Sequence, residues 1–216
     1  MKGNYDNVAP FYDLLSHLVF GNSISQALLF LVDAIPANSS VLIIGGGTGQ
    51  ILEEISKKYI SGLQITYVEI SKKMISLSKK RSTGNNLVVF INQSILDITF
   101  YQQFDVVITP FLFDNFSTRT TKVLFSKIDS LLKPFGFWLL ADFPLNEKNN
   151  LWQKLLLRIM YFFFRFLCGI EASHLPDTAS IFKKYKYQPV SKQTFYGKFI
   201  YSSIYLKPDI QILIRM

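Results

Sequence analysis

Five consecutive residues interrupt an apolar run in a pattern that can bind a polar ligand. The stretch reads VLIIGGGTGQIL over 41–52, with four apolar residues before the glycines and a helical pattern after them. A strand that turns through glycines into a helix presents free backbone N–H groups and the positive end of the helix dipole. The first candidate binding residues are therefore Gly45, Gly46, Gly47, Thr48 and Gly49.

Mononucleotides, dinucleotides and S-adenosylmethionine are all bound by turns of this kind, and the spacing distinguishes them. A P-loop needs Lys and then Ser or Thr after its last glycine, where this chain has Gln50 and Ile51. A dinucleotide fingerprint needs a small residue at the start of the helix, and that place also falls on Gln50. What remains is G-x-G-x-G, followed by an acidic residue, Glu69, twenty residues beyond Gly49.

This order of strand, G-x-G-x-G turn, helix, strand and Glu69 resembles the class I S-adenosylmethionine-dependent methyltransferases. The stretch NYDNVAPFYD over 4–13 further resembles the opening of the ubiquinone/menaquinone-type members. The resemblance implies that the glycine turn binds the methionine part of the cofactor and that Glu69 accepts hydrogen bonds from the ribose hydroxyls. The positions that it assigns to S-adenosyl-L-methionine are Tyr12, Gly45, Gly46, Gly47, Thr48, Gly49, Glu69, Ile70, Ser94, Ile95 and Pro110.

Two positions depart from the family pattern. Ile43 stands where an acidic residue usually precedes the first glycine, and Ser94 stands where an Asp usually approaches the adenine. We expect weaker cofactor binding or compensation elsewhere. The turn is also similar to the GGGDG turn of spermidine synthases. However, Thr48 replaces the Asp of that motif, and the stretch ITPFLFDNF after the fourth strand lacks paired carboxylates, so aminopropyl transfer is a minor alternative.

Short β-rich runs alternate with helical patterns along the chain, which predicts βαβ units and a parallel sheet. The end differs, because two strand patterns over 190–206 flank a Gly197-Lys198 turn and predict an antiparallel hairpin. The expected fold is α/β, a Rossmann-like, mostly parallel seven-stranded sheet with helices on both faces. We expect a single domain over 1–216, with an N-terminal helical cap (1–36) and an inserted apolar lid (146–177). The predicted strands are 41–44, 65–68, 87–91, 106–109 and 137–141, and the predicted helices are 51–59, 72–80 and 119–132.

The acceptor residues are expected where strands four and five end, since sites in open α/β sheets collect at the carboxyl ends of strands. Asp114 is either a base or orienter or a helix cap, and His17 is a second candidate, so the catalytic residue stays unassigned. No metal site is expected, because one Cys and two distant His cannot form a typical zinc site. The predicted acceptor contacts are Tyr5, Tyr12, Phe111, Phe113, Asp142 and Phe143.

The net charge of +8 comes entirely from the C-terminal third. Lys and Arg balance Asp and Glu through Glu147, whereas eleven basic residues face three acidic ones from Lys148 onward. The apolar segment 151–170 carries Lys154, Arg158 and Arg165 on one stripe, within about 40° of one another on a helix. A bilayer span is disfavoured, because Arg158 near the midplane would cost about 2.5–3.5 kcal/mol. The segment is interpreted as a lid over an apolar pocket, with contact to a membrane surface as an addition.

We interpret the chain as an S-adenosylmethionine-dependent methyltransferase that acts on a small lipophilic acceptor by O- or C-methylation. Two alternatives stay open: a non-catalytic binding protein of the same fold, and an RNA or protein methyltransferase, for which the basic C-terminal third is the only indication. Nucleic acid is not the expected partner, and a homodimer is left open. No signal-peptide pattern begins the chain and a single cysteine fits a reducing compartment, so a cytoplasmic location is expected.

Overall fold

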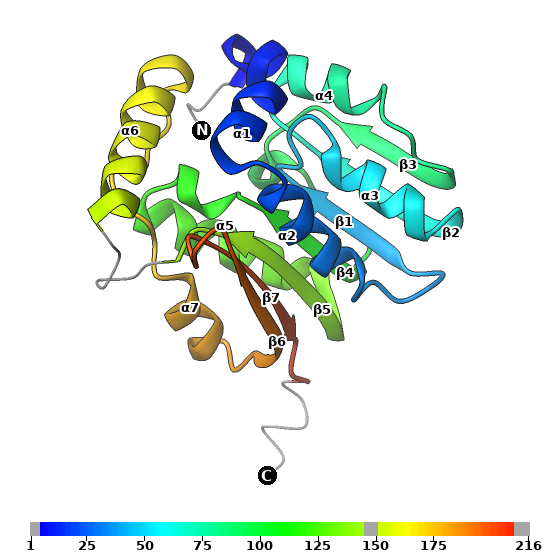
Figure 1. Ribbon diagram of the computed structural model, residues 1–216. Coiled ribbons are helices and arrows are strands. Elements are labelled where there is room, and N and C mark those ends of the chain that lie inside the picture. Colours follow the sequence, from blue (N-terminus) through cyan, green and yellow to red (C-terminus); the bar gives the residue numbers. More distant parts are fainter. Residues whose placement is uncertain (1–4, 145–150, 210–216) are drawn as a thin grey trace.

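The computed structural model describes residues 5–144 and 151–209, and its centre is a seven-stranded sheet (Figure 1). The strand order is β3-β2-β1-β4-β5-β7-β6, and β7 runs in the direction opposite to the other six strands. The predicted Rossmann-like sheet with a terminal antiparallel hairpin is therefore confirmed. The strands are β1 (Ser40–Ile44), β2 (Ser61–Val68), β3 (Asn85–Ile91), β4 (Phe104–Pro110), β5 (Leu132–Asp142), β6 (Gln188–Phe195) and β7 (Ile200–Leu206).

Helices cover both faces of the sheet, which is why the central runs 41–44 and 106–108 are apolar on every residue. Along β1, Leu42 and Ile44 pack on the face covered by α5 and α7, whereas Val41 and Ile43 pack on the face covered by α2 and α3. All four side chains are buried.

The α-helices are α1 (Tyr12–Phe20), α2 (Ser23–Val32), α3 (Gln50–Lys58), α4 (Lys72–Ser78), α5 (Thr118–Leu131), α6 (Leu151–Cys168) and α7 (Thr178–Lys184), and the 3₁₀ turns are η1 (Tyr5–Asn7), η2 (Ala9–Phe11), η3 (Ile95–Asp97) and η4 (Phe113–Asn115).

The turn of the C-terminal hairpin has the backbone that its sequence predicts. Gly197 and Lys198 occupy its centre with φ of 60° and 69°, and Phe199 N–H donates to the Tyr196 carbonyl at 3.0 Å. Two consecutive positive φ angles match the right-handed twist of paired strands. The turn thereby fixes the register in which β6 pairs with β7.

The N-terminal cap is held against the sheet by polar contacts to the loops at its carboxyl edge. Asp6 accepts hydrogen bonds from Ser71 Oγ at 2.6 Å and from Lys73 N–H at 2.9 Å. Asp13, on α1, accepts a hydrogen bond from Thr48 Oγ1 in the glycine turn at 2.6 Å. The cap therefore lies directly over the loops that follow β1 and β2 (Figure 1).

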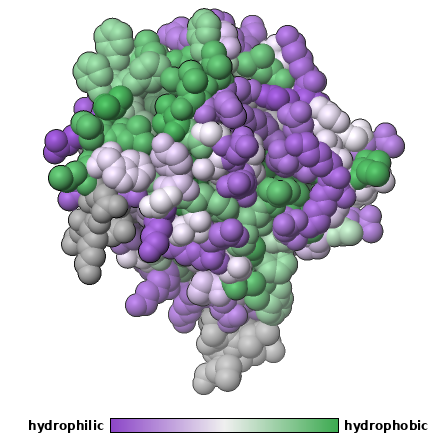
Figure 2. Space-filling view, in the orientation of Figure 1, coloured by the Kyte–Doolittle hydropathy of each residue, from purple (hydrophilic) through white to green (hydrophobic). Residues whose placement is uncertain are grey.

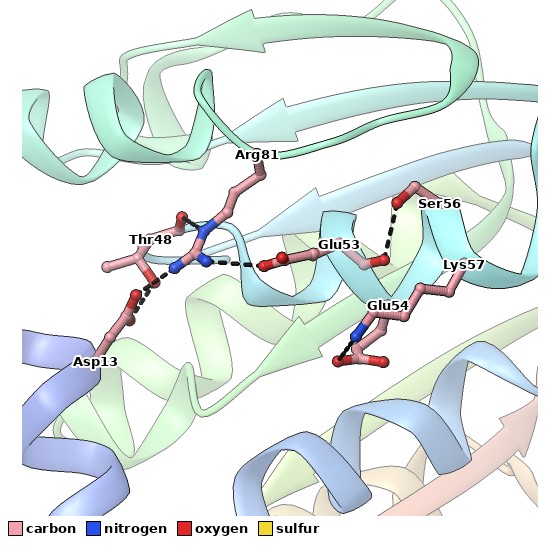
Figure 3. A network of polar contacts seen from close by, with 7 residues as sticks. All are labelled: Asp13, Thr48, Glu53, Glu54, Ser56, Lys57 and Arg81. Atoms are coloured by element: carbon pink, nitrogen blue, oxygen red, sulfur yellow. Dashed lines mark hydrogen bonds and ion pairs between the residues drawn. The ribbon is translucent and has the colours of Figure 1, made fainter.

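Arg81 forms a clamp between the cap and the glycine turn (Figure 3). Its guanidinium pairs with Asp13 on α1 and with Glu53 on α3, the latter at 2.8 Å, and its Nε donates to the Thr48 carbonyl at 3.2 Å. Its side chain is 26% exposed. A planar guanidinium can bridge several acceptors at once, which an ammonium does less well. Three segments distant in sequence are thus joined through one side chain.

The helix α6 belongs to the predicted lid and stands beside α1 at the top of the molecule (Figure 1). The side chains of Phe163 and Phe164 pack with Tyr5 and Tyr12 of the cap. The first lid residues, 146–150, lie outside the described residues. Within the described part of the chain no single helix has the length and apolarity to cross a membrane, and one bent pair, Ala9–Phe20 with Ser23–Val32 at 99°, meets that test by length and composition.

Replacing Arg81 should loosen the cap. In Arg81→Met, two ion pairs and one hydrogen bond are lost together, so we expect the free energy of unfolding to fall by about 1–2 kcal/mol. The expected readout is a lower urea midpoint and faster proteolytic cleavage within residues 5–20.

The matched control is Lys57→Met, which removes the exposed Lys57–Glu54 pair of 2.9 Å seen in the same view (Figure 3). Isolated exposed pairs contribute less than about 1 kcal/mol, so this variant should unfold and be cleaved like the wild type. Equal behaviour of the two variants would show that Arg81 does not hold the cap.

Candidate active site

A cavity of about 270 Å³ opens at the carboxyl edge of the sheet, beneath α1 and α6. One end is formed by the glycine turn and Glu69 and the other by aromatic and aliphatic side chains from the β4 and β5 loops and from both helices. The predicted site residues that line it are Tyr5, Tyr12, Gly45, Gly46, Gly47, Thr48, Glu69, Ile70, Pro110, Phe111, Asp114 and Phe143.

The lack of a side chain has a different structural consequence at each of three glycines of the turn. A Cβ on Gly46 would lie 2.5 Å from the Tyr67 ring, and one on Gly45 would lie 2.8 Å from Leu112. Gly47 has φ of +61°, and a Cβ there would meet no atom within 4 Å. Gly45 and Gly46 are thus required by packing inside the protein, whereas the space in front of Gly47 is open to a ligand.

Glu69 is buried at the end of β2 and points to the glycine turn. Its Oε2 accepts from Gly47 N–H at 3.1 Å and its Oε1 accepts from Ser71 N–H at 2.8 Å. Burial raises the pKa of Glu69, and these backbone hydrogen bonds act in the opposite direction. Each oxygen keeps a further lone pair, so the carboxylate can also accept hydrogen bonds from a diol bound in the cavity.

Three predicted cofactor residues do not line this cavity. Gly49 begins α3 with φ of +87°, and a Cβ there would lie 2.8 Å from Ser78, so this glycine is needed for helix packing. Ser94 is buried, and its Oγ accepts from Leu96 N–H at 3.2 Å, which caps η3. Ile95 packs in the core. The structure does not bring Ser94 and Ile95 to the cavity wall.

Two acidic side chains approach each other from the ends of β4 and β5. Asp142 is buried, its Oδ1 accepts from Phe143 N–H at 2.8 Å, and its Oδ2 has no partner among the described residues. Burial raises its pKa to about 7. Burial, and then the charge of Asp142, raise the pKa of Asp114 well above its usual range. At neutral pH the pair therefore holds a proton at the acceptor end of the cavity.

Asn115 connects the roof of the cavity to its floor, and sequence reasoning missed it. Its Oδ1 accepts the Tyr5 hydroxyl hydrogen of the cap, and its Nδ2 donates to Asp114 Oδ1 at 2.8 Å. Its backbone carbonyl accepts from Glu171 and Ala172 N–H, both at 3.2 Å. The cap, the β4 loop and the segment after α6 thus meet at one residue. In the sequence, only its position next to Asp114, in the segment that follows β4, indicated that it belongs to the site.

Three further predicted residues, Phe113, His17 and Asp142, do not line the cavity. Phe113 is fully buried and packs against Phe125 and Trp138, because η4 turns its ring into the core and leaves Asp114 toward the cavity. His17 lies on an exposed part of α1 and does not line the cavity. Asp142 also does not line the cavity directly and acts there only through Asp114.

Comparison with known proteins agrees with this arrangement. Residues 41–136 match the family model of a methyltransferase domain. Phosphoethanolamine N-methyltransferase of Plasmodium falciparum is 32% identical over 114 residues, which are 52% of this chain and 42% of that protein. A ubiquinone/menaquinone biosynthesis C-methyltransferase of Wigglesworthia glossinidia brevipalpis is 29% identical over 151 residues, 66% of this chain and 60% of that protein. The chain thus matches less than two thirds of the length of either relative.

The fold of this chain is also found in solved structures. The N-methyltransferase NodS from Bradyrhizobium japonicum, in complex with S-adenosyl-L-homocysteine, superimposes with a TM-score of 0.64 at 13% identity, over 86% of each chain. At that identity the likeness concerns the fold alone. The match of residues 41–136 to a methyltransferase domain, the strand order and the buried Glu69 agree with the resemblance of this chain to the class I S-adenosylmethionine-dependent methyltransferases.

Proposed function

We propose that the protein transfers the methyl group of S-adenosylmethionine to a small lipophilic acceptor, by O- or C-methylation. The observation that carries the proposal is the two-ended cavity. Polar backbone and Glu69 form one end, and the side chains of Phe111, Phe143, Met160 and Phe163 form the other. An apolar compartment next to a nucleoside cradle suits an acceptor of low polarity.

The residues at the polar end fit the cofactor. The open space before Gly47 allows close approach to the backbone, and Glu69 is held with both oxygens directed to that end. Gly45, Gly46, Thr48 and Ile70 would complete the binding surface, and Tyr12 would cover it from the cap. When bound, S-adenosylmethionine supplies an electrophilic methyl group on a sulfonium sulfur.

The remaining chemistry assigned to this chain is positioning and exclusion of water. The roof formed by α1 and α6 covers the acceptor compartment, and the Tyr5–Asn115 hydrogen bond closes one side of it. Holding two reactants in line accounts for much of the rate of such a displacement. Asp114 lines the compartment, so its carboxyl can hold an acceptor hydroxyl and exchange a proton with it.

The proposal is tested with S-adenosylmethionine labelled with tritium in the methyl group. The protein is incubated with lipophilic phenols and quinols, with RNA, or with a protein extract, and the label in each fraction is counted. We expect label in an organic-extractable product. Label confined to RNA or protein, or cofactor binding without any transfer, would support the alternative functions instead.

The first prediction of the proposed function concerns Gly47. In Gly47→Ala the new methyl group enters the open space where the cofactor backbone contact is expected, so affinity for S-adenosyl-L-homocysteine should fall at least tenfold. The measurement is calorimetric titration of the purified variant.

A control separates this effect from backbone strain. Gly197, in the distant hairpin turn, has φ of +60°, and a Cβ there would make ordinary contact with Trp152 at 3.4 Å. Placing alanine in the left-handed region costs about 1–2 kcal/mol at either site, so Gly197→Ala should lose similar stability and keep cofactor affinity. Unchanged affinity in Gly47→Ala would remove the turn from the cofactor site.

The second prediction concerns the buried carboxyl pair. The unfolded chain releases these protons near pH 4, whereas the native state still holds one up to about pH 7, so the free energy of unfolding should fall as pH rises between these values. Asp142→Asn places an amide where the proton is held. We expect the decline in the free energy of unfolding between these pH values to be smaller in this variant than in the wild type, by at least about 1.4 kcal/mol, the equivalent of one pKa unit.

The measurement is urea unfolding at pH 5 and pH 8. Asp97→Asn, which removes an exposed carboxylate on η3, serves as the control and should retain the wild-type difference between the two pH values. A wild-type protein that becomes more stable from pH 5 to pH 8 would contradict a shared proton at Asp114 and Asp142.

A further inference from the structure

The helix α6 has two apolar faces, and only one of them packs against the protein. Leu156, Met160, Phe163 and Phe164 line the cavity or pack on the cap. The opposite face is exposed to a degree unusual for such residues, with Phe162 at 77%. The exposed apolar residues of α6 are Leu151, Trp152, Leu155, Ile159, Phe162 and Phe166.

These outward residues form one continuous stripe. With 100° per residue, the six positions fall within a sector of about 100° on the helix. Neighbouring α1 and η2 extend the surface with Phe11, Leu14 and Leu18, which are 65%, 62% and 73% exposed. Figure 2 shows the hydrophobic surface gathered over α6 and α1 at the top of the molecule. Monomers seldom leave so large an apolar patch uncovered.

A row of cations borders the stripe on one side. Lys154, Arg158 and Arg165 are exposed on α6 and lie within about 40° of one another, directly beside the apolar sector. In the described part of the chain none of them forms an ion pair with an acidic side chain. An apolar stripe flanked by unpaired cations is the composition of helices that lie in the headgroup region of anionic bilayers.

The apolar surface is continuous with the cavity. Ile159 is 56% exposed on the outer stripe and also lines the cavity, together with Met160 of α6 and Leu15 and Val19 of α1. The rim of the acceptor compartment therefore lies at the edge of the apolar patch. A lipophilic molecule could pass from a lipid phase into the compartment without crossing water.

The geometry points to an anionic lipid surface as the occupant of this patch, with α6 and α1 lying in the interface and the cavity rim facing the lipid. A second copy of the chain fits less well, because antiparallel two-fold packing of α6 against α6 would place the cationic rows of both copies on the same side of the interface. The patch is defined by exposure and charge alone. The inference of a lipid surface is therefore independent of the proposed methyl transfer.

The test is co-sedimentation of the full chain, without cofactor, with vesicles of phosphatidylcholine alone or of equimolar phosphatidylcholine and phosphatidylglycerol. We expect binding to the anionic vesicles that weakens with added salt. Each basic residue near such a surface strengthens binding about fivefold, so changing Lys154, Arg158 and Arg165 together to Gln should weaken binding at least tenfold.

The matched control changes the same charge elsewhere. Lys57, Lys79 and Lys80 are exposed on or just after α3 and α4, on the side of the molecule away from α6 (Figure 1). Their joint change to Gln should leave vesicle binding within about twofold of the wild type. Equal losses in both triple variants would mean general adsorption of a basic protein and would overturn the inference.

A second pair of variants tests the apolar stripe. Phe162→Ser with Phe166→Ser, on the outer face, should weaken binding to anionic vesicles and leave the urea midpoint and cofactor affinity unchanged. Phe163→Ser, on the inner face, should lower the urea midpoint and leave vesicle binding unchanged in the fraction that remains folded. A wild-type protein that ignores anionic vesicles, or that forms dimers dispersed by the Phe162 and Phe166 changes, would refute the lipid surface.

Discussion

The packing of the Tyr67 ring beneath the glycine turn is the constraint on which the site depends. A Cβ at Gly46 would overlap that ring, and the Tyr67 hydroxyl donates to the Gly47 carbonyl at 2.9 Å. The hydroxyl thus fixes the direction of one peptide, while Glu69, directly after β2, accepts a hydrogen bond from Gly47 N–H. Tyr67 lies on β2 and Glu69 follows its last residue directly, so one register between β1 and β2 sets both the shape of the turn and the position of its carboxylate.

The roof of the site is held in a different way from the floor. Strand ladders fix the floor, whereas α1 and α6 are attached through side chains alone, by apolar packing and by a few polar contacts, chiefly those of Arg81 and Asn115. Both residues join segments far apart in sequence, and neither is itself buried in an apolar core. Elements held by few polar contacts open at lower free energy than a central sheet. A ligand could therefore enter by displacement of the cap or of α6 while β1 and β2 stay in place.

The sheet could be predicted from sequence because its signals are local. Runs such as 41–44 and 106–108 are apolar on both faces, and the Gly197-Lys198 turn specifies its own hairpin. The same holds for Glu69, whose distance from the glycine turn is fixed by one helix and two strands. Ser94 was misplaced because the family pattern gives a sequence position and not the direction of a side chain. In this chain its hydroxyl caps η3 instead of reaching the cavity.

The contacts that hold the roof could not be predicted, because they form between segments that are distant in sequence. Nothing local in Arg81 or Asn115 shows that they face Asp13 or Tyr5. The buried face of α6 was harder still to predict, because a periodic pattern locates the buried face of a helix only when the other face is polar. Here Phe162 and Phe163 are alike in sequence, yet one is exposed and the other lines the cavity. The only asymmetry available was the row of Lys154, Arg158 and Arg165. Charged groups stay in water unless they are paired, so the row indicates the outer side of the helix. It does not fix the exposure of each neighbour, because Tyr161 lies about 20° from Lys154 on the helix and still packs against the core.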